Sequence, residues 1–290
     1  MISYTTESIR NIALTGHGAA GKTTLVELIL HHAGKLAAPG TVEKGNTVCD
    51  FDPQEKAHQH SLDSALVHLD YQGAHINLID TPGFTDFIGQ AIAVLPAVET
   101  VAVVINAQTG IEAMTQRMME RAAERRQCRM IIINKIDAEN LDLPGLLSQI
   151  QDSFGRECLP INLPAEGGTR VVDCFFNPAG DSDFSSVAAA HSALIDQVVE
   201  MDEDLMALYL EQGDELQPDQ LHAPFEKALR EGHLIPICFV SARTGAGVKE
   251  LLEIFVKLLP NPLEGNPEPL VKGEGAVVEE VRTIPDPKRH

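Results

Sequence analysis

Short apolar segments alternate with longer amphipathic segments along most of the chain. The segments that we expect to form strands are 12–15, 65–69, 75–79, 101–105, 130–133 and 235–240. Three of them are nearly continuous apolar runs, which is typical of parallel strands covered on both faces. The segments with helical spacing of apolar residues are 22–33, 86–98, 112–126 and 247–259. This alternation predicts an α/β fold with a doubly wound, mostly parallel sheet.

One part of the chain departs from this alternation and is strongly acidic. Between Arg170 and Lys227 there is no Lys or Arg, but there are 13 Asp or Glu residues. We interpret this part as an inserted acidic α/β subdomain, of the kind that exposes a solvated face or a docking surface. The expected organisation is a core made of 1–155 and 236–262, the insert at 156–235, and a Pro- and Gly-rich linker at 263–290.

The amino-acid composition limits which partners and which cellular location we expect for the chain. The 22 Lys and Arg residues against 42 Asp and Glu residues give a formal net charge of −20, so we expect no direct DNA contact and no membrane contact through the overall field. The five cysteines form no Cys-x-x-Cys pair and are expected to be core residues rather than disulfide or zinc ligands. No apolar run reaches the ~18–20 residues that span a bilayer, and we expect a cytoplasmic location.

The strongest motif is a phosphate-binding loop that joins the first expected strand to the first expected helix. The segment from Gly16 to Thr23 fits G-x-x-x-x-G-K-[ST]. In such a loop the backbone N–H groups point inward, and the helix N-terminus adds its positive dipole end. Lys22 is expected to reach the β- and γ-phosphates, and the Thr23 hydroxyl is expected to bind Mg²⁺. The other residues expected to line the phosphates are His17, Gly18, Ala19, Ala20, Gly21 and Thr24.

Two further short motifs follow expected strands and predict which nucleotide is bound. Asp80-Thr-Pro-Gly83 places Asp80 near Mg²⁺ and the Gly83 N–H near a γ-phosphate. In Asn134-Lys135-Ile-Asp137 the Asp137 carboxylate can accept from N1–H and the 2-amino group of guanine, donors that adenine lacks on that edge. Lys135 is expected along the base, and Ser241-Ala242 offers a backbone N–H for guanine O6. The order of these motifs predicts GTP or GDP as the ligand.

These motifs together resemble the GTP-binding domain of elongation factor G and its relatives, the translational GTPases. The resemblance covers nearly the whole chain, including Asp80-Thr-Pro-Gly-Phe-Thr-Asp-Phe87 and the insert, which resembles the subdomain that engages the ribosomal stalk. It implies a monomeric GTPase that acts on the ribosome through further domains outside this sequence, with a conformational step of the translocation type.

Three substitutions distinguish this chain from that family pattern. Phe84 stands where the family's water-positioning His is usual, Ser61 stands where a Mg²⁺-binding Thr is expected, and Ala19 replaces the usual loop Asp. The resemblance therefore implies an elongation factor G paralogue with catalytic positions Lys22, Gly83 and Phe84, and with slow or weakly ribosome-stimulated hydrolysis.

Two alternatives follow from Phe84. His58 and His60 could replace the missing water-orienting group, although loop histidines are more commonly solvated. The chain could also be a GTP-responsive module that binds the ribosome and hydrolyses little or no GTP. An ATPase is a third interpretation, which a guanine preference that depends on Asp137 would exclude.

Overall fold

The computed structural model describes residues 4–202, 205–206, 209, 218–266, 270–272 and 279–281. Its helices are α1 (Lys22–His32), α2 (Pro53–His58), α3 (Ile88–Val94), α4 (Ala113–Glu124), α5 (Leu143–Phe154), α6 (Val187–Val199), α8 (Pro218–Glu231) and α9 (Val248–Lys257). Its strands are β1 (Ile9–Gly16), β2 (Ala65–Tyr71), β3 (Ala74–Asp80), β4 (Thr100–Asn106), β5 (Cys128–Asn134), β6 (Cys158–Pro160), β7 (Asn162–Ala165), β8 (Arg170–Asp173), β9 (Ile235–Val240), β10 (Leu270–Lys272) and β11 (Glu279–Val281).

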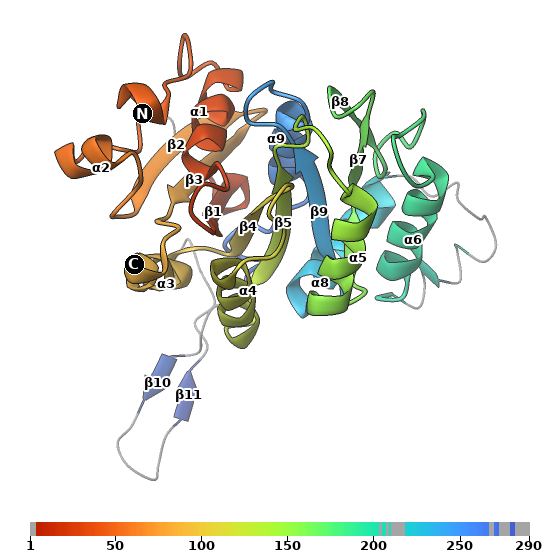
Figure 1. The fold of residues 1–290 in the computed structure, drawn as a ribbon. Coiled ribbons are helices and arrows are strands. Elements are labelled where there is room, and N and C mark those ends of the chain that lie inside the picture. The colour runs from red at the N-terminus through yellow and green to blue at the C-terminus, as the bar shows by residue number, and fades with distance from the viewer. Residues whose placement is uncertain are drawn as a thin grey trace.

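A 7-stranded sheet forms the centre of the molecule, in the order β2-β3-β1-β4-β5-β9-β6. All neighbouring pairs are parallel except β2 with β3. Helices α1 and α9 pack together on one face of this sheet, and α3 and α4 cover the other (Figure 1). The prediction of a doubly wound, mostly parallel α/β fold is confirmed.

The burial of each strand explains its sequence pattern. Every residue of β4 and of β9 is buried, which requires the continuous apolar runs seen there. The edge strand β2 alternates between buried and exposed positions, because only one of its faces meets the core. All six expected strands form, five of them with somewhat longer bounds and β9 with the expected bounds.

The helix expected at 86–98 is shorter in the structure. Only Ile88–Val94 is α-helical, and 3₁₀ turns at Thr85–Phe87 and Leu95–Ala97 flank it. Pro96 accounts for the end of the α-helix, because it has no N–H to donate to the carbonyl four residues earlier.

The acidic segment adds one strand to the main sheet as well as forming its own elements. β6 pairs in parallel with β9 at the sheet edge, while β7 and β8 form a separate antiparallel hairpin. α6 and α8 pack against each other, and α8 also contacts β5. The boundaries predicted for the insert, 156–235, remain a prediction, with β6 and α8 in contact with the core.

Several acids of this segment organise its loops rather than face solvent alone. The Asp173 carboxylate accepts from the backbone N–H groups of Phe175, Phe176 and Asn177, and Asp183 accepts from those of Gly167 and Gly168. Glu203 and Asp204 of this segment lie outside the described residues.

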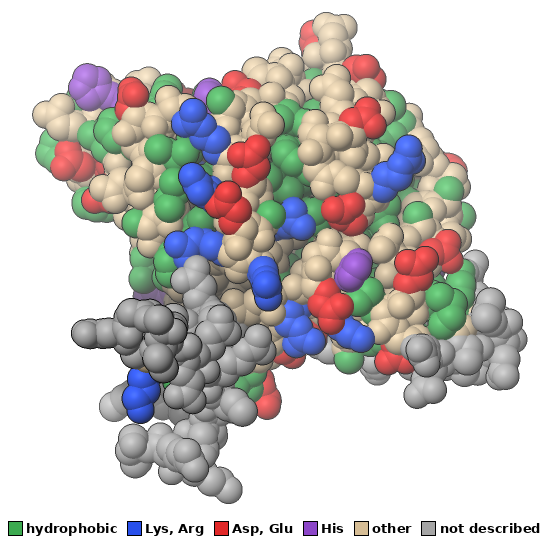
Figure 2. Space-filling model, turned by 90° about the horizontal axis from the view of Figure 1, so that it is seen from below, with side chains coloured by type: hydrophobic (Ala, Val, Ile, Leu, Met, Phe, Trp, Pro, Cys, Tyr) green, Lys and Arg blue, Asp and Glu red, His purple; other side chains and the backbone are tan. Residues whose placement is uncertain are grey.

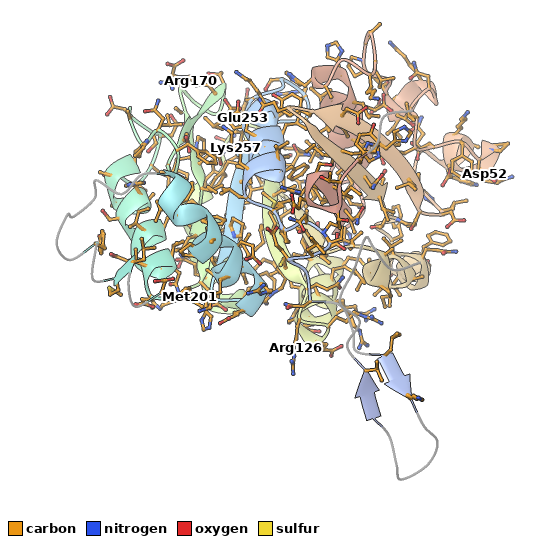
Figure 3. All side chains as sticks on the ribbon, turned by 180° about the vertical axis from the view of Figure 1, so that it is seen from behind. Asp52, Arg126, Arg170, Met201, Glu253 and Lys257 are labelled. Atoms are coloured by element: carbon orange, nitrogen blue, oxygen red, sulfur yellow. The ribbon has the colours of Figure 1, made fainter. Side chains whose placement is uncertain are left out.

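Helix α9 and strand β9 attach this segment to the core. The Lys257 ammonium of α9 lies 4.7 Å from the centre of the Phe176 ring and 3.3 Å from Glu253. Figure 3 labels Glu253 and Lys257 on α9, near the hairpin that carries Arg170. The contact between Lys257 and Phe176 joins the C-terminal end of α9 to the loop after β8.

The remaining expectations from the sequence concern the cysteines, membrane-spanning helices, surface charge and the C-terminal segment. All five cysteines are free and buried, as predicted for core residues. Among the described residues, no helix is long and apolar enough to cross a membrane. Figure 2 shows Lys and Arg interspersed with Asp and Glu over the face seen from below. Within 263–290, which we expected to be a linker, β10 and β11 pair as antiparallel strands.

We expect Asn162→Ala to lower the free energy of unfolding by roughly 2–4 kcal/mol, from about 1–3 kcal/mol for each buried group left unpaired. The side chain of Asn162 is 1% exposed, and it accepts from Phe239 N at 2.7 Å and donates to Phe239 O at 3.2 Å. Urea unfolding measures the change, and Asn177→Ala at an exposed position is the matched control. Equal stability of the two variants would show that the Asn162 bridge does not hold β7 to β9.

Candidate nucleotide site

The loop between β1 and α1 has the backbone shape of a phosphate cradle. Gly16 has φ of 127°, and a Cβ there would collide with the carbonyl oxygen of Val104 on β4. Gly21, the residue that caps α1, has φ of 90°, in the left-handed region that favours glycine. The loop can therefore pass close to the sheet and open the N-terminus of α1 towards its own centre.

Lys22 is buried and lies across this loop. Its ammonium group donates to Gly16 O at 3.0 Å and to His17 O at 2.9 Å. Burial lowers the pKa of Lys22 to about 8, while the charges of Asp80 and Glu112 act to raise it. The two carbonyls fix the position of the cation, which suits a preorganised phosphate contact.

Thr23, Ser61 and Asp80, the three expected metal ligands, lie together beside Lys22. The Thr23 hydroxyl donates to Asp80 Oδ2 at 2.6 Å and lies 3.4 Å from Ser61 Oγ. Asp80 is 1% exposed, and its Oδ1 atom is buried without a hydrogen-bond partner. An orphaned carboxylate oxygen next to two hydroxyls fits a hard cation such as Mg²⁺, which prefers oxygen ligands and retains water or phosphate oxygens.

Negative charge is concentrated at this corner of the site. The pKa of Asp80 is raised to about 6, chiefly by burial and also by the nearby Asp50 charge, although Lys22 and the Thr23 hydrogen bond act to lower it. Among the described residues no cluster of three or more His, Cys, Asp or Glu could hold a metal, so a metal here would depend on hydroxyl ligands as well.

Asp50 is a site residue that the sequence analysis missed. It is 2% exposed, accepts from Ser61 Oγ at 3.0 Å, and accepts from Thr47 Oγ1 at 2.8 Å. It lies in a stretch without strand or helix periodicity, and no quoted motif includes it. Its contact with Ser61 and its place in the lining of the phosphate cavity show that it belongs to the site.

Two buried glutamates hold the segment between α1 and β2 in place. Glu27 of α1 accepts from Gly40 N at 2.7 Å and Val48 N at 2.5 Å. Glu55 completes the capping box of α2 and accepts from Leu62 N at 2.9 Å. These bonds bring the residues around Ser61 to the phosphate loop.

The turn after β3 packs directly on the phosphate loop. A Cβ on Gly83 would collide with the Lys22 ammonium and would lie 2.5 Å from Gly18 N, so only glycine fits. The next residue, Phe84, is 41% exposed, and its ring lies over Gly18, 3.2 Å from where a Cβ would be. Any group bound by Lys22 therefore also meets Gly83.

The base end of the site is built around Asn134. Its amide donates to Ala20 O at 2.8 Å, and its Oδ1 accepts from Ala242 N at 2.9 Å. The Lys135 ammonium donates to Ala19 O at 2.8 Å. Asn134 thus ties the phosphate loop to the loop after β9 instead of facing the base directly.

Asp137, the residue expected to recognise the base, is bound by two side chains of the loop after β9. Its Oδ1 accepts from Ser241 Oγ at 2.5 Å, and its Oδ2 pairs with the Arg243 guanidinium. The Asp137 side chain is 8% exposed while that of Arg243 is 75% exposed. Arg243 is a second residue that the sequence analysis missed. Its planar guanidinium presents N–H donors to the Asp137 carboxylate, and guanine also offers N–H donors in a plane.

Two adjoining cavities connect the phosphate loop with the residues around Asn134 and Asp137. One, of about 270 Å³, is lined by Asn134, Lys135 and Asp137, and the other, of about 330 Å³, by Lys22, Ser61 and Phe84. They share three lining residues, Gly21, Thr24 and Lys135. Except for His17, Ala20 and Ser241, the predicted base and phosphate residues line these two adjoining cavities, which together form one groove.

Comparison with known proteins agrees with this geometry. The family described as "Elongation factor Tu GTP binding domain" matches residues 7–261. The chain belongs to this family. The resemblance to the GTP-binding domain of elongation factor G-like translational GTPases is therefore confirmed, as is the P-loop GTPase fold of this family.

Relatives in the family show how far the similarity extends. An elongation factor G-like protein of Mycobacterium tuberculosis is 35% identical over 269 residues, covering 88% of this chain and 38% of the relative. A mitochondrial ribosome-releasing factor 2 of Culex quinquefasciatus is 30% identical, covering 90% and 38%. A crystal structure of a Thermus thermophilus protein is 32% identical with a TM-score of 0.80, covering 89% and 41%. The chain spans about two fifths of the length of these proteins.

We expect Asp80→Asn to stabilise the chain in the absence of nucleotide and magnesium. Because the folded-state pKa is about 6 against an ordinary 3.8, the folded chain binds more protons between these values, and its stability falls as pH rises through them. The neutral amide removes that loss, so the gain should grow from near zero at pH 4 to on the order of 2–3 kcal/mol above pH 6.

Urea unfolding between pH 4 and 8 measures this difference. The exposed Asp86→Asn is the matched control for a carboxylate-to-amide change. A difference for Asp80→Asn that does not vary with pH would contradict the assignment of a desolvated carboxylate.

Proposed function

We propose that this chain is the GTP-binding domain of an elongation factor G-like translation factor, which binds GTP with Mg²⁺ and hydrolyses it to GDP and phosphate. The observation that carries this proposal is the groove with the buried Lys22 cation at one end and the Asp137 carboxylate at the other. Cation and carboxylate match the triphosphate and the guanine N1–H and 2-amino donors, respectively. GTP and GDP are therefore the ligands that fit both ends.

The phosphate end supports binding of a γ-phosphate. The inward backbone of residues 16–21 and the N-terminus of α1 supply N–H donors, and Lys22 supplies the charge. Gly83 packs on Lys22 and Gly18, so a γ-phosphate that contacts Lys22 also contacts this turn. The presence or loss of that phosphate would thus shift the turn after β3.

The metal corner supports magnesium binding by this chain's own side chains. Thr23 Oγ1 and Ser61 Oγ lie within 3.4 Å of each other, next to the unpartnered Asp80 Oδ1. When bound, Mg²⁺ would neutralise charge on the phosphates during transfer. Thr23 and Ser61 would hold it, and Asp80 with Asp50 would balance its charge. Ser61 then links this corner to the segment between α1 and β2.

The relatives support a role on the ribosome. Their names describe an elongation factor G-like protein and a ribosome-releasing factor, which share the ribosome as the site of action. We propose that GTP hydrolysis here drives a conformational step of the translocation type, through domains beyond this chain. The acidic insert would contact the ribosomal stalk, and the chain would act as a monomer in the cytoplasm.

Phe84 favours one alternative, a ribosome-binding module that responds to GTP with little hydrolysis. Its ring can neither donate to nor accept from an attacking water. Single-turnover hydrolysis with and without ribosomes distinguishes the two functions: stimulation supports the GTPase, and its absence with intact GTP binding supports the module.

Asp137→Asn should lower the affinity for GDP by roughly 10²–10⁴-fold, because two hydrogen bonds to a charged acceptor are lost at about 1.5–3 kcal/mol each. Affinity for xanthosine diphosphate should rise, since its 2-carbonyl accepts from the new amide. Calorimetry with both nucleotides and with ADP measures the change, and the exposed Glu139→Gln is the control. Preference for ADP in the unaltered chain would refute guanine recognition.

Thr23→Ala should weaken GTP binding about 10-fold or more in the presence of Mg²⁺ and have little effect in EDTA, because the lost hydroxyl acts through the cation. Affinities measured by calorimetry at both conditions test this. A loss of equal size with and without the metal would place Thr23 in the phosphate contact rather than the metal site.

A further inference from the structure

His60 lies against Phe84 at the phosphate end of the groove. The two ring centres are 4.7 Å apart at an interplanar angle of 61°, an edge-to-face contact, and the His60 ring is 6.1 Å from that of Phe87. His60 Nδ1 lies 3.4 Å from Ser61 O. The imidazole is thus next to the residue that replaces the family's water-positioning His.

His60 also lines the phosphate cavity of about 330 Å³, together with Gly18, Lys22, Gly83 and Phe84. Gly18 carries no side chain, so Phe84 rests directly on the loop backbone. The imidazole therefore borders the same space as Lys22 and Gly83, the two groups expected to hold the γ-phosphate.

Other polar side chains around this cavity are less suited to orienting a water molecule. The Thr81 hydroxyl donates to Leu14 O at 2.8 Å, and Thr23 and Ser61 belong to the metal corner. Glu43 carries a negative charge that the γ-phosphate would repel. Asp50 accepts from Ser61 and Thr47, and Thr24 and Lys135 also line the cavity at the base end. Gln59 is exposed at the end of α2 and is a competitor that the test must address.

We propose that His60 orients the attacking water for GTP hydrolysis, in place of the residue at position 84. This inference rests on the proposed function. The water oxygen forms a bond to the γ-phosphorus, the bond from that phosphorus to the β–γ bridging oxygen breaks, and its electron pair stays on GDP. The water proton goes to the released phosphate, so His60 is unchanged at the end. Phe84 is then a positioning residue, whose ring holds the imidazole edge-to-face.

His58 is the natural control for this role. It lies on the last turn of α2, it is exposed, and its ring centre is 5.9 Å from that of His60. It does not belong to the residues that line the phosphate cavity. Replacing His60 should therefore slow GTP hydrolysis, whereas replacing His58 should not.

The test is single-turnover hydrolysis of γ-labelled GTP by the 290-residue chain, with nucleotide affinity measured in parallel. His60→Ala should slow hydrolysis by ~10²–10⁴-fold and leave GTP affinity within about threefold. His60→Gln, which can still hydrogen-bond to water, should recover part of the rate, and His58→Ala should match the unaltered chain. Unchanged hydrolysis in His60→Ala, or a larger loss in Gln59→Ala, would overturn the proposal.

A second variant, Phe84→His, tests the same proposal when the unaltered chain hydrolyses GTP slowly. Phe84→His should raise the rate by less than about threefold, because the water is already oriented. A gain above about tenfold would show that position 84 lacks a group that nothing else supplies, and would overturn the role of His60. Failure of the unaltered chain to bind GTP would instead refute the proposed function, so the two failures are distinguishable.

Discussion

A buried lysine cation dominates the architecture of the site. Lys22 is held by two carbonyl oxygens of its own loop, and burial lowers its pKa to about 8. Burying a charge is costly unless it is paired and hydrogen-bonded, and carbonyl dipoles compensate only part of that cost. A phosphate supplies the missing negative charge, so the loop is shaped for a ligand that completes its electrostatics.

The sheet provides the conditions that this loop needs. β1 lies between β3 and β4, so the loop after β1 opens at the point where the connections leave towards opposite sides of the sheet. Gly16 allows the loop to approach Val104 of β4, and the turn after β3 packs back on Lys22 through Gly83. The turn at the end of β3 is therefore in direct contact with Lys22, the residue expected to bind phosphate.

The carboxylates of Asp80 and Asp50 place negative charge beside the phosphate loop, opposite in sign to the charge of Lys22. Asp50 lies close enough to raise the pKa of Asp80, and the Lys22 charge, the Thr23 hydroxyl and the Thr81 backbone N–H act in the opposite direction. The site as a whole thus combines a cation that requires an anion with carboxylates that require a cation. This pairing fits a nucleotide bound together with a metal better than it fits either alone. At the base end, Arg243 neutralises Asp137 in a similar way.

Local pattern was enough to predict six strands of the main sheet, the helices at 22–33, 112–126 and 247–259, and the loops at the ends of those strands. Strand and helix periodicity reflects burial on a sheet, and the phosphate loop is contiguous in sequence, so its chemistry can be recognised without knowing the fold. The family resemblance depended on the same contiguous motifs.

Only the tertiary structure decided the contacts between segments that have no periodic pattern. β6 joins the main sheet from within the acidic segment, Asp50 reaches Ser61 across eleven positions, Arg243 pairs with Asp137 from another loop, and His60 meets Phe84. Each depends on how separate loops pack over the carboxyl edge of the sheet, and side-chain spacing along the chain carries no information about such packing.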